Sequence, residues 1–238
     1  GTTGGLHTVA IRMPSHPIAR DFIRESGRMI AAPSANTSGR PSPTLASHVY
    51  EDMQGRIPLI LDGGAVGIGI ESTIIDMSTG IQTILRPGYI TKDMLEEVLP
   101  EVKIDPAVSG RTMKKDIVAK APGMKYRHYA PKGQLTLVEG DKDKVIAKIN
   151  ELVREKKEEG YKVGVIGTDE TLDHADILRS IGSRQKPESV AANLYRILRE
   201  FDDLECDYMY SESFFEQGLG NAIMNRMLKA AGYHLITL

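Results

Sequence analysis

The chain has 238 residues and a mass of 26.1 kDa, and 41% of its residues are hydrophobic and 26% charged. This is the composition of a globular protein with room for two domains, and it argues against intrinsic disorder. A net charge of −2 and a pI near 6.4 exclude the overall positive charge of a dedicated nucleic-acid binder. The single cysteine, Cys206, excludes an intramolecular disulfide and a cysteine-based zinc cluster.

The first elements are predicted to alternate between strand and helix. Thr8–Met13 has the apolar, β-branched character of a strand, and His16–Ser26 carries apolar residues at helical spacing. Met29–Ala32 is a second predicted strand. It leads into a loop of small and polar residues, Ile30–Pro43, with the sequence IAAPSANTSGRPSP.

Short elements follow this loop, and glycine-rich turns separate several of them. They are a helix over Pro43–Met53, strands over Ile57–Asp62, Ser72–Asp76 and Gln82–Leu85, and a helix over Thr91–Leu99. Ser42 or Thr44 is expected to cap the first helix, and Thr91 the second. Because apolar strands repeatedly end in polar loops, we expect those loops to share one rim of an α/β sheet.

Periodicity is lost over Glu101–Pro131, which is the best candidate for an interdomain linker. Strands and helices then alternate regularly. The strands are predicted at Gln134–Val138, Lys162–Ile166, Ile177–Ile181, Tyr208–Tyr210 and His234–Thr237, and the helices at Lys142–Glu158, Pro187–Phe201 and Gly220–Ala231. This alternation predicts a second domain with a parallel, Rossmann-like sheet.

The polar loop Ile30–Pro43 is the first candidate binding segment. Its small residues allow a ligand to approach the backbone, and Ser34, Asn36 and Ser42 offer hydrogen-bonding groups. A nucleotide phosphate would suit it. An ordinary surface loop has a similar composition, so the loop alone leaves both interpretations open.

Charged and hydroxyl side chains near the other strands are the next candidates. Thr8 and Arg12 lie four residues apart and therefore on one face of the predicted strand, where an arginine binds a carboxylate or pairs with a structural acid. Ser72 and Arg86 lie at strand ends, where they serve either a ligand or a turn.

The linker segment Ala121–Pro131 (APGMKYRHYAP) concentrates aromatic and cationic side chains, among them Arg127, His128 and Tyr129. Such groups stack on a base and neutralise phosphate, whereas a solvated linker favours Pro, Gly, Ser, Glu and Lys. This composition favours a binding function. Dinucleotide-binding, Walker, nucleophile-elbow and histidine-metal motifs are absent from the sequence.

Taken in order, these segments resemble the Sua5/YrdC family of threonylcarbamoyl-AMP synthases. The matching stretches are TVAIRMPSHP, APSANTSGRPSPT, IESTIID with ILRPG, APGMKYRHYAP and GLGNAIMNRMLKAAG. The resemblance implies a partial YrdC-like twisted α/β sheet domain, followed by a smaller Rossmann-like parallel-sheet Sua5 domain. The implied division is residues 1–104 for the catalytic portion, 105–131 for the linker and 132–238 for the second domain.

The resemblance also implies a reaction. L-threonine, bicarbonate and ATP, with Mg²⁺ on the phosphates, give threonylcarbamoyl-AMP and pyrophosphate without a covalent enzyme intermediate. A separate threonylcarbamoyl transferase complex then modifies tRNA to t6A, with direct tRNA binding by this protein as a further expectation. The implied location is the cytoplasm.

The family's site residues transfer to this sequence by motif. The threonine site would comprise Arg12, Ala32 and Ser72, and the ATP site Thr8, Ser34, Asn36, Ser42, Arg86 and Tyr129, with Arg127 and His128 as additional linker contacts. The family's upstream Lys-x-Arg motif and its strand are not found in the sequence. We therefore expect an incomplete catalytic domain, with about a hundred further residues upstream in the natural protein.

Two other functions compete with synthesis of the adenylate. One is an RNA- or nucleotide-binding module without turnover. The other is a carbamoyl transferase related to hydrogenase maturation proteins, which is weakened by the Sua5-type linker and by the lack of cysteine-rich segments.

Overall fold

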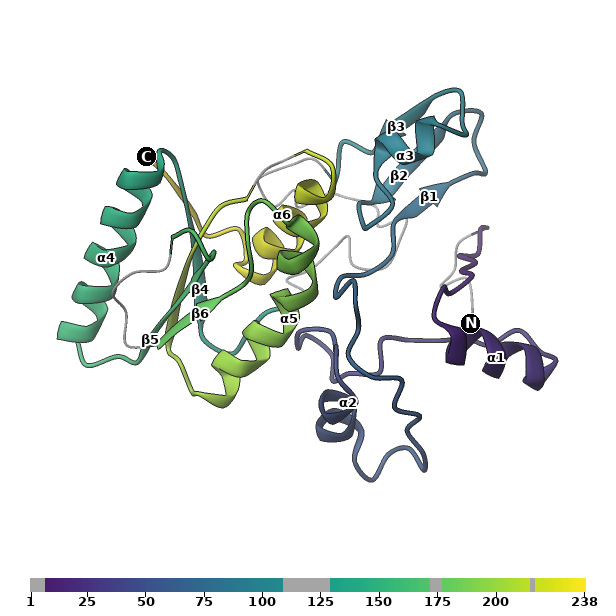
Figure 1. The fold of residues 1–238 in the computed structure, drawn as a ribbon, viewed down its shortest axis with the longest axis horizontal. Helices are drawn as coiled ribbons and strands as arrows, with labels where there is room; N and C mark the ends of the chain where they lie inside the picture. The colour runs from purple at the N-terminus through teal and green to yellow at the C-terminus, as the bar shows by residue number, and fades with distance from the viewer. Residues whose placement is uncertain (1–6, 109–128, 172–176, 215–216) are drawn as a thin grey trace.

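The structure of the protein is a computed structural model, which describes residues 7–108, 129–171, 177–214 and 217–238 (Figure 1). Arg127 and His128, the two additional linker contacts that the resemblance implies, lie outside these residues. The first half of the described chain contains α1 (Pro17–Ser26), α2 (Ala46–Met53), β1 (Ile74–Asp76), β2 (Gln82–Arg86), α3 (Lys92–Glu96) and β3 (Val102–Ile104). The second half contains β4 (Gln134–Glu139), α4 (Lys142–Glu158), β5 (Val163–Gly167), β6 (Ile177–Ser180), α5 (Pro187–Asp203), β7 (Tyr208–Glu212), α6 (Leu219–Ala230) and β8 (Leu235–Thr237).

The first half carries a small mixed sheet in the order β1-β2-β3. β1 pairs antiparallel with β2, and β2 pairs parallel with β3. The crossover between the parallel strands contains α3. As predicted, the Thr91 side chain caps α3 by accepting a hydrogen bond from the Met94 amide at 3.3 Å.

The second half is a five-stranded, all-parallel sheet in the order β6-β5-β7-β4-β8, which confirms the predicted Rossmann-like architecture. Figure 1 shows α4 on one face of the sheet and α5 and α6 on the other. Connections between parallel strands are nearly always right-handed, so the direction of a crossover along the sheet decides which face its helix covers. The crossover from β4 to β5 through α4 runs in one direction, and those through α5 and α6 run in the other. The helices therefore lie on opposite faces.

Each face of this sheet has its own apolar core. Val145, Ile149 and Val153 of α4 recur at helical spacing and pack on one face. The larger core lies under α5 and α6. It also contains Ile70 and Tyr129, which lie outside both the second sheet and its helices, so the first half of the chain contributes to the core of the second.

Three predicted strands are wrong: Thr8–Met13, Met29–Ala32 and Ile57–Asp62 contain no strand. Their local sequence is apolar, but a strand exists only where a neighbouring strand completes its hydrogen bonds. In the described residues these segments have no such neighbour. Their apolar side chains are open to solvent, with Ile11 89% and Met13 88% exposed.

Smaller differences occur near the site. β1 begins at Ile74 instead of Ser72, and the unpredicted strand β3 adds to the first sheet. Helix α2 begins at Ala46, and neither predicted cap is used, because Leu45 is its N-cap. The hydroxyl of Ser42 instead donates a hydrogen bond to Glu71, 29 residues away.

Candidate functional site

The backbone of the loop before α2 is held by a side chain of the same loop. Asn36 Nδ2 donates to the carbonyl oxygens of Thr37, at 2.8 Å, and Arg40, at 3.3 Å. In the described part of the chain, buried side-chain polar atoms without a hydrogen-bond partner are Asn36 Oδ1, Arg40 Nε, Thr44 Oγ1 and Asp202 Oδ2. Three of these four belong to this loop region. Buried polar groups are normally satisfied, so the loop retains capacity for polar partners.

Glu71 connects this loop with the second half of the chain. Its carboxylate accepts hydrogen bonds from Ser42 Oγ at 2.7 Å, Tyr195 Oη at 2.9 Å and Arg226 Nε at 2.8 Å. Tyr195 lies on α5 and Arg226 on α6, and both side chains are fully buried. A single carboxylate therefore joins the serine loop to two helices of the second sheet.

Arg86, at the end of β2, is itself a predicted site residue and contacts another, Ser72. Its Nε donates to the Ser72 carbonyl at 3.0 Å, which fixes the segment before β1. The Tyr129 ring lies 5.1 Å from the Tyr195 ring, and the Tyr195 hydroxyl donates to Glu71, so Tyr129 belongs to the same region. Ser42, Ser72, Arg86 and Tyr129 are thus brought together around Glu71.

Three cationic side chains interact electrostatically with this carboxylate, and Arg226 also contacts it directly. Burial, followed by the charges of Arg226 and Arg86, lowers the pKa of the Lys229 ammonium to about 8. Burial and the charge of Arg226 also lower the pKa of Arg86. Burial by itself would raise the pKa of Glu71, but the charge of Arg226 and hydrogen bonds from Ser42 and Arg226 outweigh it, so this pKa is lowered. The cluster of Glu71, Arg86, Arg226 and Lys229, termed the cationic cluster, has excess positive charge that suits an anionic ligand.

A second buried ion pair lies beside the same loop. Arg199 of α5 donates to Asp52 of α2 through Nη2 at 2.7 Å, and its Nε donates to the Pro41 carbonyl at 3.0 Å. Arg40 also pairs with Asp52, and the Thr37 amide donates to it at 3.1 Å. This network holds the loop at residues 37–41, whereas Glu71 holds it at Ser42.

Other predicted site residues lie apart from this cluster. Thr8, Arg12, Ala32 and Ser34 are all exposed. Among the described residues, none of these four side chains forms a hydrogen bond or ion pair with the cationic cluster. A weak contact between the segment near Arg12 and the glycine turn is made by His16 Nε2, 3.3 Å from the Gly63 carbonyl oxygen.

The sequence reasoning missed Glu71, Tyr195, Arg199 and Arg226. No functional group was predicted in the second domain. Arg226 lies within the family-like stretch GLGNAIMNRMLKAAG, but that stretch by itself assigned it no role. A signal was nevertheless present for the two arginines, since each interrupts the apolar, buried face of a helix. A charge at such a position indicates a buried partner.

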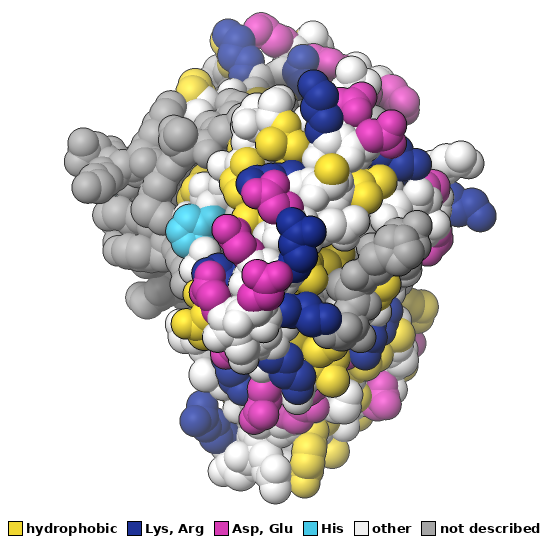
Figure 2. Space-filling model, turned by 90° about the vertical axis from the view of Figure 1, so that its left-hand side faces the viewer, with side chains coloured by type: hydrophobic (Ala, Val, Ile, Leu, Met, Phe, Trp, Pro, Cys, Tyr) yellow, Lys and Arg dark blue, Asp and Glu magenta, His cyan; other side chains and the backbone are white. Residues whose placement is uncertain are grey.

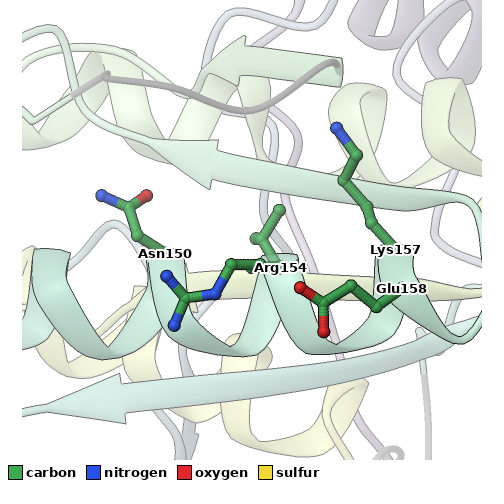
Figure 3. A pocket seen from close by; sticks show the side chains of 5 residues that line it. Asn150, Arg154, Lys157 and Glu158 are labelled. Atoms are coloured by element: carbon green, nitrogen blue, oxygen red, sulfur yellow. The ribbon is translucent and has the colours of Figure 1, made fainter.

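A surface hollow on α4 does not qualify as the site. It is lined by Asn150, Val153, Arg154, Lys157 and Glu158, all from this one helix, and the labelled side chains stand along its surface (Figure 3). Seen from the left of Figure 1, this side of the molecule intersperses Lys and Arg with Asp and Glu (Figure 2). It therefore offers no single-sign surface for a polyanion.

Neither a resident metal nor a membrane helix is evident in the described residues. Their His, Cys, Asp and Glu side chains form no group of three that could ligate a metal ion. None of the helices formed by those residues has the length and apolar character needed to cross a bilayer.

The fold and the cluster define a two-part α/β protein with a cationic, hydroxyl-lined site where the parts meet. Two family models match it: "Threonylcarbamoyl-AMP synthase, C-terminal domain" over residues 90–232 and "Telomere recombination" over residues 1–88. The chain belongs to the Sua5/YrdC family.

Relatives and solved structures agree with this assignment. The chain is 50% identical over 234 residues to the threonylcarbamoyl-AMP synthase of Pyrococcus abyssi, covering 98% of this chain and 67% of that protein. It is 48% identical over 236 residues to that of Bacillus subtilis, covering 98% and 66%. The crystal structure of P. abyssi Sua5 complexed with L-threonine superposes with a TM-score of 0.91 at 50% identity, covering 99% of this chain and 67% of that one. The chain thus spans about two thirds of the length of these relatives.

Proposed function

We propose that the protein is an L-threonylcarbamoyladenylate synthase, a nucleotidyltransferase that converts L-threonine, bicarbonate and ATP into threonylcarbamoyl-AMP and pyrophosphate. The observation that carries this proposal is the cationic cluster, where three cations and one carboxylate lie beside Ser42, Ser72 and Tyr129. The relatives of highest identity given above are named for this activity, and a solved relative holds L-threonine.

The proposed residue roles follow the family motifs. Threonine would contact Arg12, Ala32 and Ser72, and ATP would contact Thr8, Ser34, Asn36, Ser42, Arg86 and Tyr129, with Arg127 and His128 as further linker contacts. Arg86 is the best supported of these by its surroundings, because it is a partly buried cation next to two others. Such a charge offsets the repulsion between phosphates.

The product dictates the bonds that change. The threonine nitrogen bonds to the bicarbonate carbon with loss of water, a carbamate oxygen bonds to the α-phosphorus, and pyrophosphate leaves. In the proposed enzyme, Arg86 stabilises the negative charge of the phosphates, and the serine loop orients the nucleotide. Mg²⁺ would accompany ATP through phosphate oxygens, since the described residues provide no three-ligand acidic site, and no step above depends on it.

The remaining parts of the proposal concern organisation and partners. We propose residues 1–104 as catalytic portion, 105–131 as linker and 132–238 as second domain. The adenylate would pass to a tRNA-modifying threonylcarbamoyl transferase complex in the cytoplasm.

The decisive experiment measures pyrophosphate release by the natural protein with ATP, bicarbonate and either L-threonine or L-valine. We expect release that depends on threonine, and the product should incorporate both labelled bicarbonate and threonine. Absence of release, together with salt-sensitive RNA binding, would instead support the binding module. Arg12→Ala is expected to weaken threonine binding and Arg86→Ala to weaken ATP binding, and calorimetry showing the reverse would refute the assigned roles.

A further inference from the structure

Arg226, on helix α6 of the second half, contacts residues beside the proposed substrate site, a role that its family-like stretch GLGNAIMNRMLKAAG does not by itself assign. Its Nε donates to the Glu71 carboxylate at 2.8 Å, its Nη2 to the Glu71 carbonyl at 3.2 Å and its Nη1 to the Pro87 carbonyl at 2.7 Å. The side chain is fully buried. One guanidinium thus joins two segments that are separated by strands β1 and β2.

Glu71 extends this connection to the serine loop. Glu71 Oε1 accepts a hydrogen bond from the Ser42 hydroxyl at 2.7 Å, and Glu71 Oε2 accepts hydrogen bonds from both Tyr195 and Arg226. Ser42 is therefore bonded to the ion pair directly, and Ser72 and Arg86 are the sequence neighbours of Glu71 and Pro87, whose carbonyl groups Arg226 binds. These three residues belong to the proposed ATP and threonine sites.

We propose that Arg226 and Glu71 are a positioning pair through which the second domain sets the geometry of the substrate site. Neither side chain is assigned to the reacting atoms. The pair acts through Ser42, through the backbone beside Ser72 and through the backbone that carries Arg86. This proposal rests on the function proposed above.

The chemistry of the site requires an arginine at this position. A guanidinium has five N–H donors in a planar fork, so it serves a carboxylate and two carbonyl oxygens at once. A lysine retains the charge opposite Glu71, but its single nitrogen cannot reach the same set of acceptors in fixed directions. Arg226→Lys should therefore keep the ion pair and release the segment at Pro87.

The test compares Arg226→Met, Arg226→Lys and Glu71→Gln in the natural protein. Arg184→Met is the control, because Arg184, although partly exposed, forms an ion pair with the buried Glu212 entirely within the second half. Far-UV circular dichroism establishes that each variant is folded. Steady-state kinetics then gives kcat and KM for ATP and for threonine, and hydrogen exchange is measured in peptides containing residues 42, 72 and 88.

We expect Arg226→Met and Glu71→Gln to lose about 100-fold in kcat/KM for both substrates, as for a small misplacement of binding groups. Arg226→Lys should retain an intermediate activity. Exchange should accelerate in the three site peptides of these variants and remain at the wild-type rate in Arg184→Met. Wild-type kinetics and exchange in folded Arg226→Met would overturn the proposal.

The two proposals fail in different ways. If the wild-type protein releases no threonine-dependent pyrophosphate, the proposed function fails, but hydrogen exchange still decides whether Arg226 holds the three segments. If the wild-type protein is active and the variants lose stability alone, with unchanged kinetics per folded molecule, the positioning role is refuted and the proposed function stands.

Discussion

Removing one partner of the buried ion pair of Arg199 and Asp52 should destabilise the protein by several kcal/mol. Arg199 is 1% exposed and the Asp52 side chain is fully buried, with Nη2 and Oδ2 separated by 2.7 Å. Removing one partner of a buried pair costs about 3–5 kcal/mol, because the other charge stays buried without compensation. Asp52 retains Arg40 and the Thr37 amide, so we expect Arg199→Met to cost about 3 kcal/mol, at the lower end of this range.

A double-mutant cycle separates the pair from its surroundings. In Arg199→Met/Asp52→Leu both charges are replaced by apolar groups, so no buried charge is left without a partner. The loss in free energy of unfolding should therefore be about 1–3 kcal/mol smaller than the sum of the losses in the two single variants. Urea unfolding followed by far-UV circular dichroism is suitable, because the chain contains no tryptophan to report by fluorescence.

Arg179→Met provides the control for the cycle. Arg179 pairs with Glu200 at a partly exposed site within the second half, so its loss should cost at most about 1 kcal/mol. Strict additivity of the Arg199 and Asp52 variants, or an Arg199→Met cost no greater than that of the control, would refute the argument.

Further predictions concern pH, conformation and ligand binding. Burial by itself would raise the pKa of Asp52, but hydrogen bonds from Arg199 and Thr37 and the charges of Arg199 and Arg40 lower it. The Asp52 contribution to stability should therefore be complete above about pH 4 and decline below it, and Asp52→Asn should flatten acid unfolding curves there. The pKa of Lys229 lies at about 8 in the folded state and near 10.4 unfolded, so stability should rise between these pH values, by at most about 3 kcal/mol; a rise that survives in Lys229→Met would contradict this. ATP bound at the cationic cluster should raise the pKa of Lys229, and calorimetry at pH 8 in buffers of different ionisation enthalpy should detect uptake of roughly half a proton, absent in Lys229→Met. Gly69→Ala should destabilise by more than about 2 kcal/mol, because Gly69 has φ +69° and an added Cβ would lie 2.4 Å from the Ala191 carbonyl oxygen; Gly64→Ala, with φ +86° but open space, measures the backbone strain alone.

The second half of the fold was predictable because its signals are local. Lys142–Glu158 is helical over the predicted residues, with an apolar stripe and an Asp141 cap that accepts the Asp143 amide at 3.2 Å. The strand at Val163–Gly167 is fully buried, as its continuous apolar run predicted. The alternation of such elements leaves few topologies for the sheet.

The first half was less predictable because strands depend on distant partners. Thr8–Met13 has the right residues for a strand but lies exposed without a ladder in the described structure. The site shows the same limit. Local composition singled out Ser42, Ser72, Arg86 and Tyr129, whereas Glu71 and Arg226 are related by a contact across 155 positions that leaves no periodic pattern.

The ion pairs of Arg199 and Arg226 also bear on modularity. Both arginines come from the second half, and both principal acceptors, Asp52 and Glu71, come from the first. A chimaera that joins the first half of this chain to the second half of another protein would strand two buried carboxylates unless arginines occurred at both positions. A functional exchange of one half must therefore keep both arginine–carboxylate pairs, and the two halves of this protein cannot be exchanged independently.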